Sequence, residues 1–331
     1  MSTTAATTPT TADHRYLRVA QLQRLRHLRF APSRHVEGTY AGRHASRQRG
    51  QSVEFADYRE YTPGDEPNNV DWKVYGRSDR LFVKLFEHQT NMSVHLLLDA
   101  SASMGFDGIG KAGRTGATQR GTQRGESRDA AVLKYDHAAM IAGSVAFLTL
   151  SQQDRVSLSF AQNGLAQHIP SQSRMPQLRR MLDEMEARRT ATRGRAELAR
   201  AIEAVHRLAP RRGVLVVVSD LLEATEPIVK ALSRWTARGS EVIVFQTLHR
   251  DELHLPEDVD EAVFTDSETG RRVRLRVDDL REDYHQRLRR RIDAWNTALR
   301  GRGIDHNLVS TATPYHDALK RYLFRRTAAT S

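Results

Sequence analysis

The stretch from residue 95 to residue 106, HLLLDASASMGF, decides the fold that the sequence predicts. An apolar segment runs directly into Asp99, and two serines, Ser101 and Ser103, follow at alternate positions. A short apolar run bounded by turn residues is typical of a strand that is buried on both faces of a parallel sheet. Asp99 then stands at the carboxyl end of this strand, where open α/β sheets bind their ligands.

The polar side chains of this stretch admit two interpretations. A carboxylate followed by alternating hydroxyls offers hard oxygen ligands, which suit magnesium better than zinc. The same side chains could instead cap the following helix through hydrogen bonds to its first N–H groups. The stretch alone favours neither interpretation.

A second segment repeats the pattern. GVLVVVSDL, residues 213–221, is an apolar run that ends in Ser219 and Asp220. Strand-like and helix-like segments alternate around both runs, which predicts a parallel sheet with right-handed crossovers. The carboxyl ends of the two strands can then lie side by side and join Asp99, Asp220 and the two serines in one oxygen-rich site. We therefore expect an α/β fold with a doubly wound, mostly parallel sheet.

Hydrophobic periodicity predicts the remaining elements. The expected helices are within 13–30 and at 135–151, 174–186, 196–208, 225–238, 279–300 and near the C-terminus. The expected further strands are within 51–61 and 81–87 and at 155–160, 241–248 and 304–310, with a hairpin turn at 268–270.

The same pattern suggests how the chain is organised. Residues 1–12 are expected to be a disordered tail, since they are rich in Thr and Ala and lack the apolar core of a secretory signal. A helix and a β-rich segment would occupy 13–90. The α/β core would occupy 91–250, with a flexible Gly- and Arg-rich insertion at 107–128. A hairpin, a long helix, a strand and a helix in 251–326 would complete the fold.

Composition excludes some classes of function. The chain has 331 residues and no cysteine, which excludes disulfides and thiolate chemistry. Its longest apolar runs fall well short of the roughly 20 residues that a membrane-spanning helix needs. The net charge of +11 would suit a basic nucleic-acid-binding protein. Nucleic acid remains a minor alternative, because the basic residues are mostly arginine, spread along the chain without interleaved aromatic residues.

Two motifs resemble known families. The spacing Asp99-x-Ser101-x-Ser103 is similar to the metal-ion-dependent adhesion site of von Willebrand factor A domains. The segment YREYTPGDEPNNVDWKVYGRSDRLFVKLFE, residues 58–87, resembles the bacterial family called domain of unknown function 58. This second resemblance extends over roughly residues 35–325. It implies a von Willebrand A-like core with an N-terminal β-rich elaboration packed on it.

The resemblance also implies a set of metal ligands. The two serines would bind Mg²⁺ directly, and Asp99 and Asp220 would act largely through water. In von Willebrand factor A domains a threonine of a second loop is a further ligand. Here that loop reads Gly-Arg-Ala-Glu-Leu, with Ala196 at the threonine position. Thr192 could substitute only if the loop rearranges. We therefore expect a Mg²⁺ site that Ala196 weakens.

The function that the resemblance implies is a non-enzymatic protein-interaction module in the bacterial cytoplasm. Family members are commonly encoded beside MoxR-type AAA+ ATPases, so the expected role is adaptor or co-chaperone of such an ATPase. A Mg-dependent hydrolase using Asp99 and Asp220 is the enzymatic alternative. Against it, Ser101 stands where such a phosphatase would carry a second carboxylate, and neither a Gly-x-Ser-x-Gly elbow nor a Walker loop is present.

The turn-rich segment before residue 75 also admits two interpretations. In the structural one, Trp72 and Tyr75 pack against the sheet. In the functional one, nearby charged residues form a docking surface: Arg59, Asp65, Glu66, Asp71 and Lys73.

Overall fold

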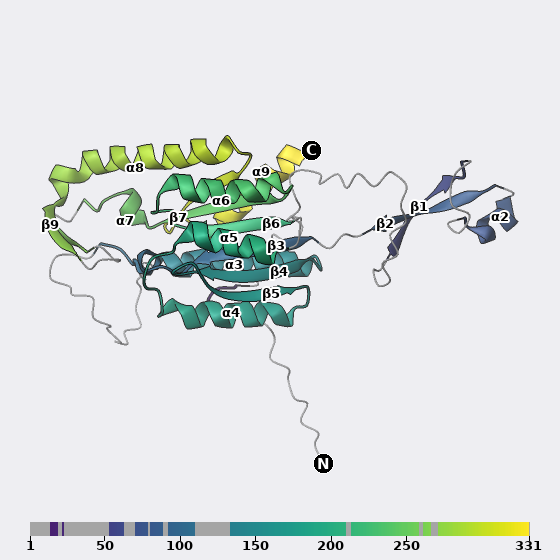
Figure 1. The fold of residues 1–331 in the computed structure, drawn as a ribbon, viewed down its shortest axis with the longest axis horizontal. Coiled ribbons are helices and arrows are strands. Elements are labelled where there is room, and N and C mark those ends of the chain that lie inside the picture. The colour runs from purple at the N-terminus through teal and green to yellow at the C-terminus, as the bar shows by residue number, and fades with distance from the viewer. Residues whose placement is uncertain are drawn as a thin grey trace, which may run out of the picture. The chain divides into compact units, whose positions relative to one another are not determined.

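The computed structural model describes most of the chain in two compact units. The described residues are 14–18, 22, 53–62, 70–78, 80–88, 92–109, 133–209, 213–257, 261–265 and 271–330. One unit comprises residues 1–36 and 92–331, and the other comprises residues 37–91 (Figure 1). The predicted tail and most of the insertion at 107–128 lie outside the described residues, as does most of the predicted helix within 13–30. Among the described helices, none has the length and apolar character that crossing a bilayer requires.

A six-stranded sheet forms the centre of the larger unit. Its order is β10-β7-β6-β3-β4-β5, and every neighbouring pair is parallel except β4 and β5. The strands are β3 (Ser93–Asp99), β4 (Arg155–Ala161), β5 (Leu165–Gln172), β6 (Val214–Ser219), β7 (Glu241–Leu248) and β10 (Asp305–Ser310). The prediction of a doubly wound, mostly parallel α/β sheet is therefore confirmed.

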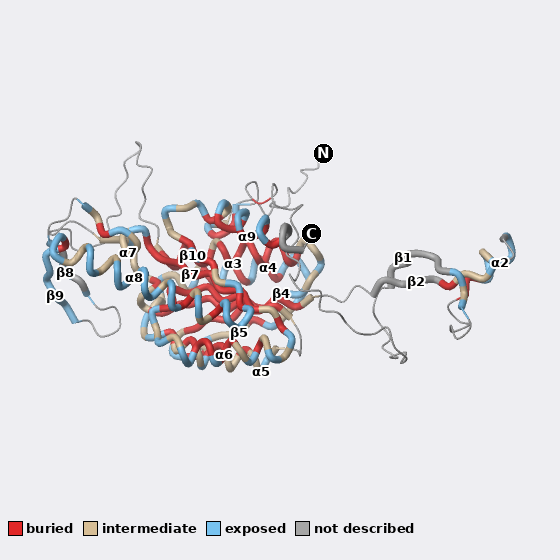
Figure 2. Tube along the Cα trace, turned by 90° about the horizontal axis from the view of Figure 1, so that it is seen from above, coloured by how far each residue is buried: buried red, intermediate tan, exposed pale blue. Residues whose placement is uncertain are grey.

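Helices cover both faces of this sheet, because alternate residues of the buried strands point to opposite sides. Leu96 and Leu98 join one apolar cluster, and Leu97 joins the other. The first face is covered by α3 (Lys134–Ser151), α4 (Pro176–Arg189) and α9 (Tyr315–Thr330). The second face is covered by α5 (Leu198–Leu208), α6 (Thr225–Ala237) and α8 (Val277–Arg300). Figure 2 shows the buried residues as a continuous band between the two helical layers.

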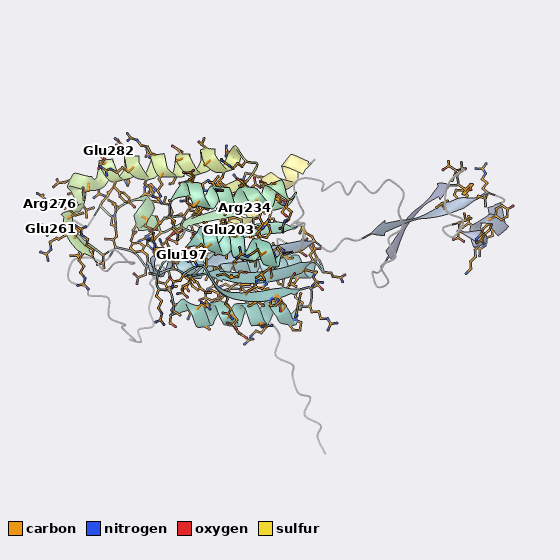
Figure 3. All side chains as sticks on the ribbon, viewed as in Figure 1. Glu197, Glu203, Arg234, Glu261, Arg276 and Glu282 are labelled. Atoms are coloured by element: carbon orange, nitrogen blue, oxygen red, sulfur yellow. The ribbon has the colours of Figure 1, made fainter. Side chains whose placement is uncertain are left out.

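The outward surfaces of the helices are polar, as expected of amphipathic segments. On the second face, Arg234 of α6 donates to Glu203 of α5 at 2.6 Å, and both residues are visible at the surface in Figure 3. Such an exposed pair contributes little to stability. The apolar clusters beneath the helices hold this layer in place.

The topology fixes where a ligand site can form. From β3 the chain proceeds to β4 and β5 on one side, and then crosses to β6, β7 and β10 on the other. The carboxyl ends of β3 and β6 are consequently adjacent, with Leu98 paired to Val218. This is the switch point of a doubly wound sheet, where a crevice opens between the outgoing connections.

Further elements follow β7 at the carboxyl end of the sheet. They are α7 (Arg250–Leu253) and the antiparallel strands β8 (Glu261–Thr265) and β9 (Arg272–Arg276), which lead into α8 (Figure 1). The predicted hairpin and long helix are confirmed, although the turn between β8 and β9 lies outside the described residues. Neither α7 nor β5 is among the elements that the sequence predicted.

The smaller unit pairs β1 (Val53–Glu60) with β2 (Phe82–His88) in antiparallel fashion and holds α2 (Trp72–Ser78) between them in sequence. Asp71 accepts hydrogen bonds from the N–H groups of Lys73 and Val74 at 2.9 and 3.3 Å, so it caps α2. Trp72 is 62% exposed and meets Tyr75 edge to face. The prediction that Trp72 packs against a sheet is therefore wrong within this unit.

Candidate functional site

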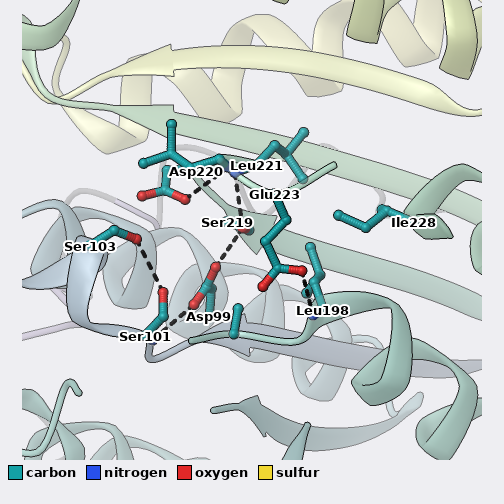
Figure 4. A pocket seen from close by; sticks show the side chains of 11 residues that line it. Asp99, Ser101, Ser103, Leu198, Ser219, Asp220, Leu221, Glu223 and Ile228 are labelled. Carbon is teal, nitrogen blue, oxygen red and sulfur yellow. Dashed lines mark hydrogen bonds between the residues drawn. The ribbon is translucent and has the colours of Figure 1, made fainter. Parts of the chain in front are cut away.

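The carboxyl ends of β3 and β6 bring the predicted site residues together. Asp99 is the last residue of β3, Ser219 is the last residue of β6, and Asp220 follows it. All three are at most 2% exposed. Figure 4 shows them beside Ser101 and Ser103, which lie at the start of the short 3-10 helix η2 (Ala102–Gly105). Residues 120 positions apart in sequence thus share one pocket.

Hydrogen bonds hold the Asp99 carboxylate in place at both oxygens. Its Oδ1 accepts the N–H of Ser101 at 2.9 Å, and its Oδ2 accepts the hydroxyl of Ser219 at 2.6 Å. Ser101 is the residue before η2, so its N–H is not one of the N–H groups of η2, and the side chain of Ser101 makes no capping hydrogen bond. The helix-capping interpretation is therefore wrong for both Asp99 and Ser101.

The two serine hydroxyls lie side by side. Ser101 Oγ and Ser103 Oγ are 3.2 Å apart. Neighbouring oxygen ligands of an octahedral Mg²⁺ are about 3 Å apart, given metal–oxygen distances of about 2.1 Å. The spacing of the two hydroxyls is therefore close to that of neighbouring magnesium ligands, and the two buried carboxylates would favour the charge of such an ion.

Lys134 and Glu252 join the site although neither was predicted to belong to it. Lys134, the first residue of α3, has no exposed surface. Its Nζ donates to Asp220 Oδ2 at 2.8 Å and to Glu252 Oε1 at 2.7 Å. The backbone N–H of Lys134 also donates to the carbonyl of Phe106 at 3.1 Å, so the start of α3 is bonded to the residue that follows η2. Periodicity could not predict the two side-chain contacts of Lys134. They join the start of α3 to Asp220 and to Glu252 of α7, which are distant in sequence.

Burial and charge perturb the titratable groups of the site. Burial, and then the negative charge of Asp220, raise the pKa of Asp99 to about 7. Burial alone would lower the pKa of Lys134, but the charges of Asp220 and Glu252 outweigh it and raise that pKa. Burial likewise raises the pKa of Glu252. The acidic groups outnumber the single ammonium group, so the site carries excess negative charge when all of them are ionised.

The pocket between these groups is very small. Its volume of about 10 Å³ is room for one water molecule or one metal ion. Its lining includes the four predicted residues together with Ser219, Glu223 and Ala196. Among the residues that the structure describes, no group of three or more His, Cys, Asp or Glu side chains is placed to hold a metal.

The second loop departs from the family pattern as the sequence indicated. Ala196 lines the pocket and is 4% exposed, but it has no oxygen atom in its side chain. Thr192 is not part of the pocket lining. Its Oγ1 lies 2.9 Å from the position that a Cβ on Gly105 would take, so Thr192 packs against η2. Thr192 does not replace the missing ligand in this arrangement.

Comparison with known proteins gives relatives in sequence and matches among solved structures. Uncharacterized proteins of Mycobacterium bovis and of two Mycobacterium tuberculosis strains are 28% identical over 264 residues, which is 78% of this chain and 75% of each relative. The structure of the conserved hypothetical protein BatB from Bacteroides thetaiotaomicron matches with a TM-score of 0.43 and 14% identity, covering 72% of this chain and 99% of that one. An aerotolerance-related membrane protein from Bacteroides fragilis matches with a TM-score of 0.42 and 14% identity, covering 71% and 99%. The family model described as "Protein of unknown function DUF58" matches residues 57–293, and the chain belongs to this family.

Proposed function

We propose that this chain is a non-enzymatic protein-interaction module whose rim at Asp99, Ser101, Ser103 and Asp220 docks an acidic residue of a partner. The partner is a MoxR-type AAA+ ATPase, and the role is that of adaptor or co-chaperone in the bacterial cytoplasm. The observation that carries the proposal is the pocket itself. It lies at the switch point of the sheet, gathers hard oxygen atoms, and has room for one ion.

Magnesium would join the rim to the partner. Ser101 and Ser103 would hold the ion directly, and Asp99 and Asp220 would act through water. When bound, the ion supplies a positive charge that a carboxylate of the partner can approach. Without it, the excess negative charge of the rim repels such a carboxylate. Docking of an acidic partner should therefore depend on the metal.

The hydrolase alternative has less support from the geometry. Both oxygens of Asp99 accept hydrogen bonds, which hold the carboxylate in a fixed position. Asp220 is engaged in the same way, since Lys134 donates to one oxygen and the N–H of Leu222 to the other at 3.3 Å. These contacts favour a carboxylate pair that positions an ion over one that attacks a substrate.

The test is direct binding of the purified chain to a nucleotide-free MoxR-type ATPase from the same cell, with and without Mg²⁺. Leaving out nucleotide confines the effect of metal removal to the rim. We expect Mg²⁺-dependent binding that the double variant Ser101→Ala, Ser103→Ala abolishes. The matched control is Ser173→Ala, since Ser173 is exposed beyond β5 at the opposite end of the sheet. Unchanged binding by the double variant, or cross-links that map to the opposite end, would contradict the proposal.

A further inference from the structure

We infer that Glu223 supplies the oxygen ligand that Ala196 lacks, so that the cation site is built from Ser101, Ser103 and Glu223. The inference deepens the proposed function and rests on its cation-dependent rim. It assigns a site residue on the loop between β6 and α6, which the motif comparison did not single out.

The position of Glu223 is the first support. Both Glu223 and Ala196 line the pocket. Glu223 Oε2 accepts the N–H of Leu198 at 3.1 Å, and Leu198 lies two residues after Ala196. The carboxylate is thereby tied to the loop that carries the vacant ligand position. In Figure 4 the Glu223 side chain reaches from its own loop toward Leu198 and Asp99.

The second support is the other oxygen of the same carboxylate. Glu223 Oε1 is buried and has no hydrogen-bond partner among the described residues. The oxygens of Asp99 and Asp220 each accept a hydrogen bond, so Oε1 is the carboxylate oxygen that the pocket leaves unsatisfied. A buried acceptor without a partner is costly, and a bound cation would satisfy it.

The loop that carries Glu223 and the loop that carries Ala196 each contain a residue in a left-handed backbone conformation. Leu221 and Glu197 have φ values of 55° and 47°, in the left-handed region that side chains other than glycine rarely adopt. Leu221 directly precedes Leu222 and Glu223, and all three residues line the pocket. Strained residues of this kind persist where the surrounding structure requires them, often at binding sites.

Exchanging a threonine for a glutamate ligand changes the charge of the site. A carboxylate is a stronger ligand for a hard divalent cation than a neutral hydroxyl. It also adds to the negative charge that Lys134 only partly offsets. The site is therefore selective for divalent cations with a preference for oxygen, of which Mg²⁺ and Mn²⁺ are the relevant examples.

The inference is tested by titrating the metal-free full chain with Mn²⁺, whose paramagnetism reports binding directly. Glu223→Gln keeps an acceptor for the N–H of Leu198 but removes the charged ligand, and we expect it to weaken binding by about tenfold or more. Glu226→Gln is the matched control, because Glu226 is exposed in the first turn of α6. This control should bind as the wild type does.

A second pair of variants tests whether Glu223 fills the threonine position. Ala196→Thr should change the affinity little in the wild type but recover part of the loss in the Glu223→Gln background. Ala196→Ser provides a smaller hydroxyl should threonine disturb the fold, which thermal unfolding would reveal. Absence of rescue by both hydroxyl variants would overturn the inference, as would wild-type affinity of Glu223→Gln or no Mn²⁺ binding by the wild type.

These outcomes can be separated from failure of the proposed function. If Mn²⁺ binds through Glu223 but the ATPase does not dock, the site assignment stands and the proposed partner is wrong. If the ATPase docks through the serines while Glu223→Gln leaves Mn²⁺ binding unchanged, the proposed function stands and the Glu223 assignment is wrong.

Discussion

Lys134 is an ammonium group with no exposed surface, held between the carboxylates of Asp220 and Glu252. Removing one partner of a buried ion pair leaves uncompensated charge. We therefore expect Lys134→Met to lower the free energy of unfolding by about 3–5 kcal/mol. Urea denaturation measures this loss.

A matched control separates the buried charge from the loss of a lysine as such. Lys230 is exposed on α6, so Lys230→Met should change the free energy of unfolding by no more than about 0.5 kcal/mol. Equal destabilisation by the two variants would contradict a special role for the Lys134 contacts.

His95 links the stability of β3 to pH. Burial chiefly, and the charge of His168, lower the pKa of His95 from 6.5 to about 4. The unfolded chain then binds more protons between these two pH values, so stability is lost as the pH falls from 6.5 toward 4. The maximum loss is about 3 kcal/mol. His95→Gln removes this titration and should flatten the dependence of the unfolding free energy on pH in that window.

The comparison for His95 is His254→Gln, since His254 is exposed. That variant should keep the full acid sensitivity of the wild type. Other groups keep some dependence in His95→Gln, since burial also lowers the pKa of His306 to about 4 and raises that of Asp99 to about 7. An unchanged pH profile for His95→Gln would show that protonation of His95 is not coupled to unfolding.

At the scale of elements, the strands that carry the site were predictable and the edge strand β5 was not. β3 and β6 are buried at every position, so each appears in the sequence as a continuous apolar run. β5 has one buried position, Ile169, because the strand lies at an edge of the sheet. Its exposed and half-buried residues do not alternate regularly, so no strand pattern appears in the sequence. α7 has four residues, too few for a periodic signal, and its capping by His249 depends on a folded turn.

The junction of β3 and β6 offers a test of how tightly these strands pair. A Cβ on Gly213, just before β6, would lie 2.5 Å from the carbonyl oxygen of Ser93. Because the obstacle is backbone, Gly213→Ala should cost about 1–3 kcal/mol of unfolding free energy. Gly76→Ala is the control, since a Cβ at Gly76 would meet no atom within 4 Å. Denaturation of Gly213→Ala at the wild-type midpoint would contradict this packing.

At the scale of the whole molecule, the sequence predicted those site residues whose positions follow from the sheet topology alone. Asp99 and Asp220 could be placed together because both end buried parallel strands. Lys134, Glu223 and Glu252 could not, because their contacts depend on the direction of single side chains and on bends such as the one at Leu221. The charge balance of the rim, which decides what it can bind, is therefore a property of the folded chain.

Residues near the N-terminus also make long-range contacts within the larger unit. Tyr16, Leu17 and Leu22 are at most 1% exposed and join the apolar cluster that contains α3 and α4. The Tyr16 hydroxyl donates to Asp136 at 3.0 Å, and Arg189 donates to the same carboxylate at 2.8 Å. This segment thus ties residues near the start of the chain to the helical layer.

Truncation measures what that contact contributes. Burying each large apolar side chain stabilises the fold by about 1.5–3 kcal/mol, so deletion of residues 1–22 should lower Tm by more than about 10 °C. Deletion of residues 1–12 leaves all three buried side chains in place and should leave Tm unchanged. Tyr16→Phe isolates the hydroxyl and should cost only about 1 kcal/mol, since Asp136 keeps its contact with Arg189. If the longer deletion melted at the wild-type temperature, the segment would not be part of the cooperative core.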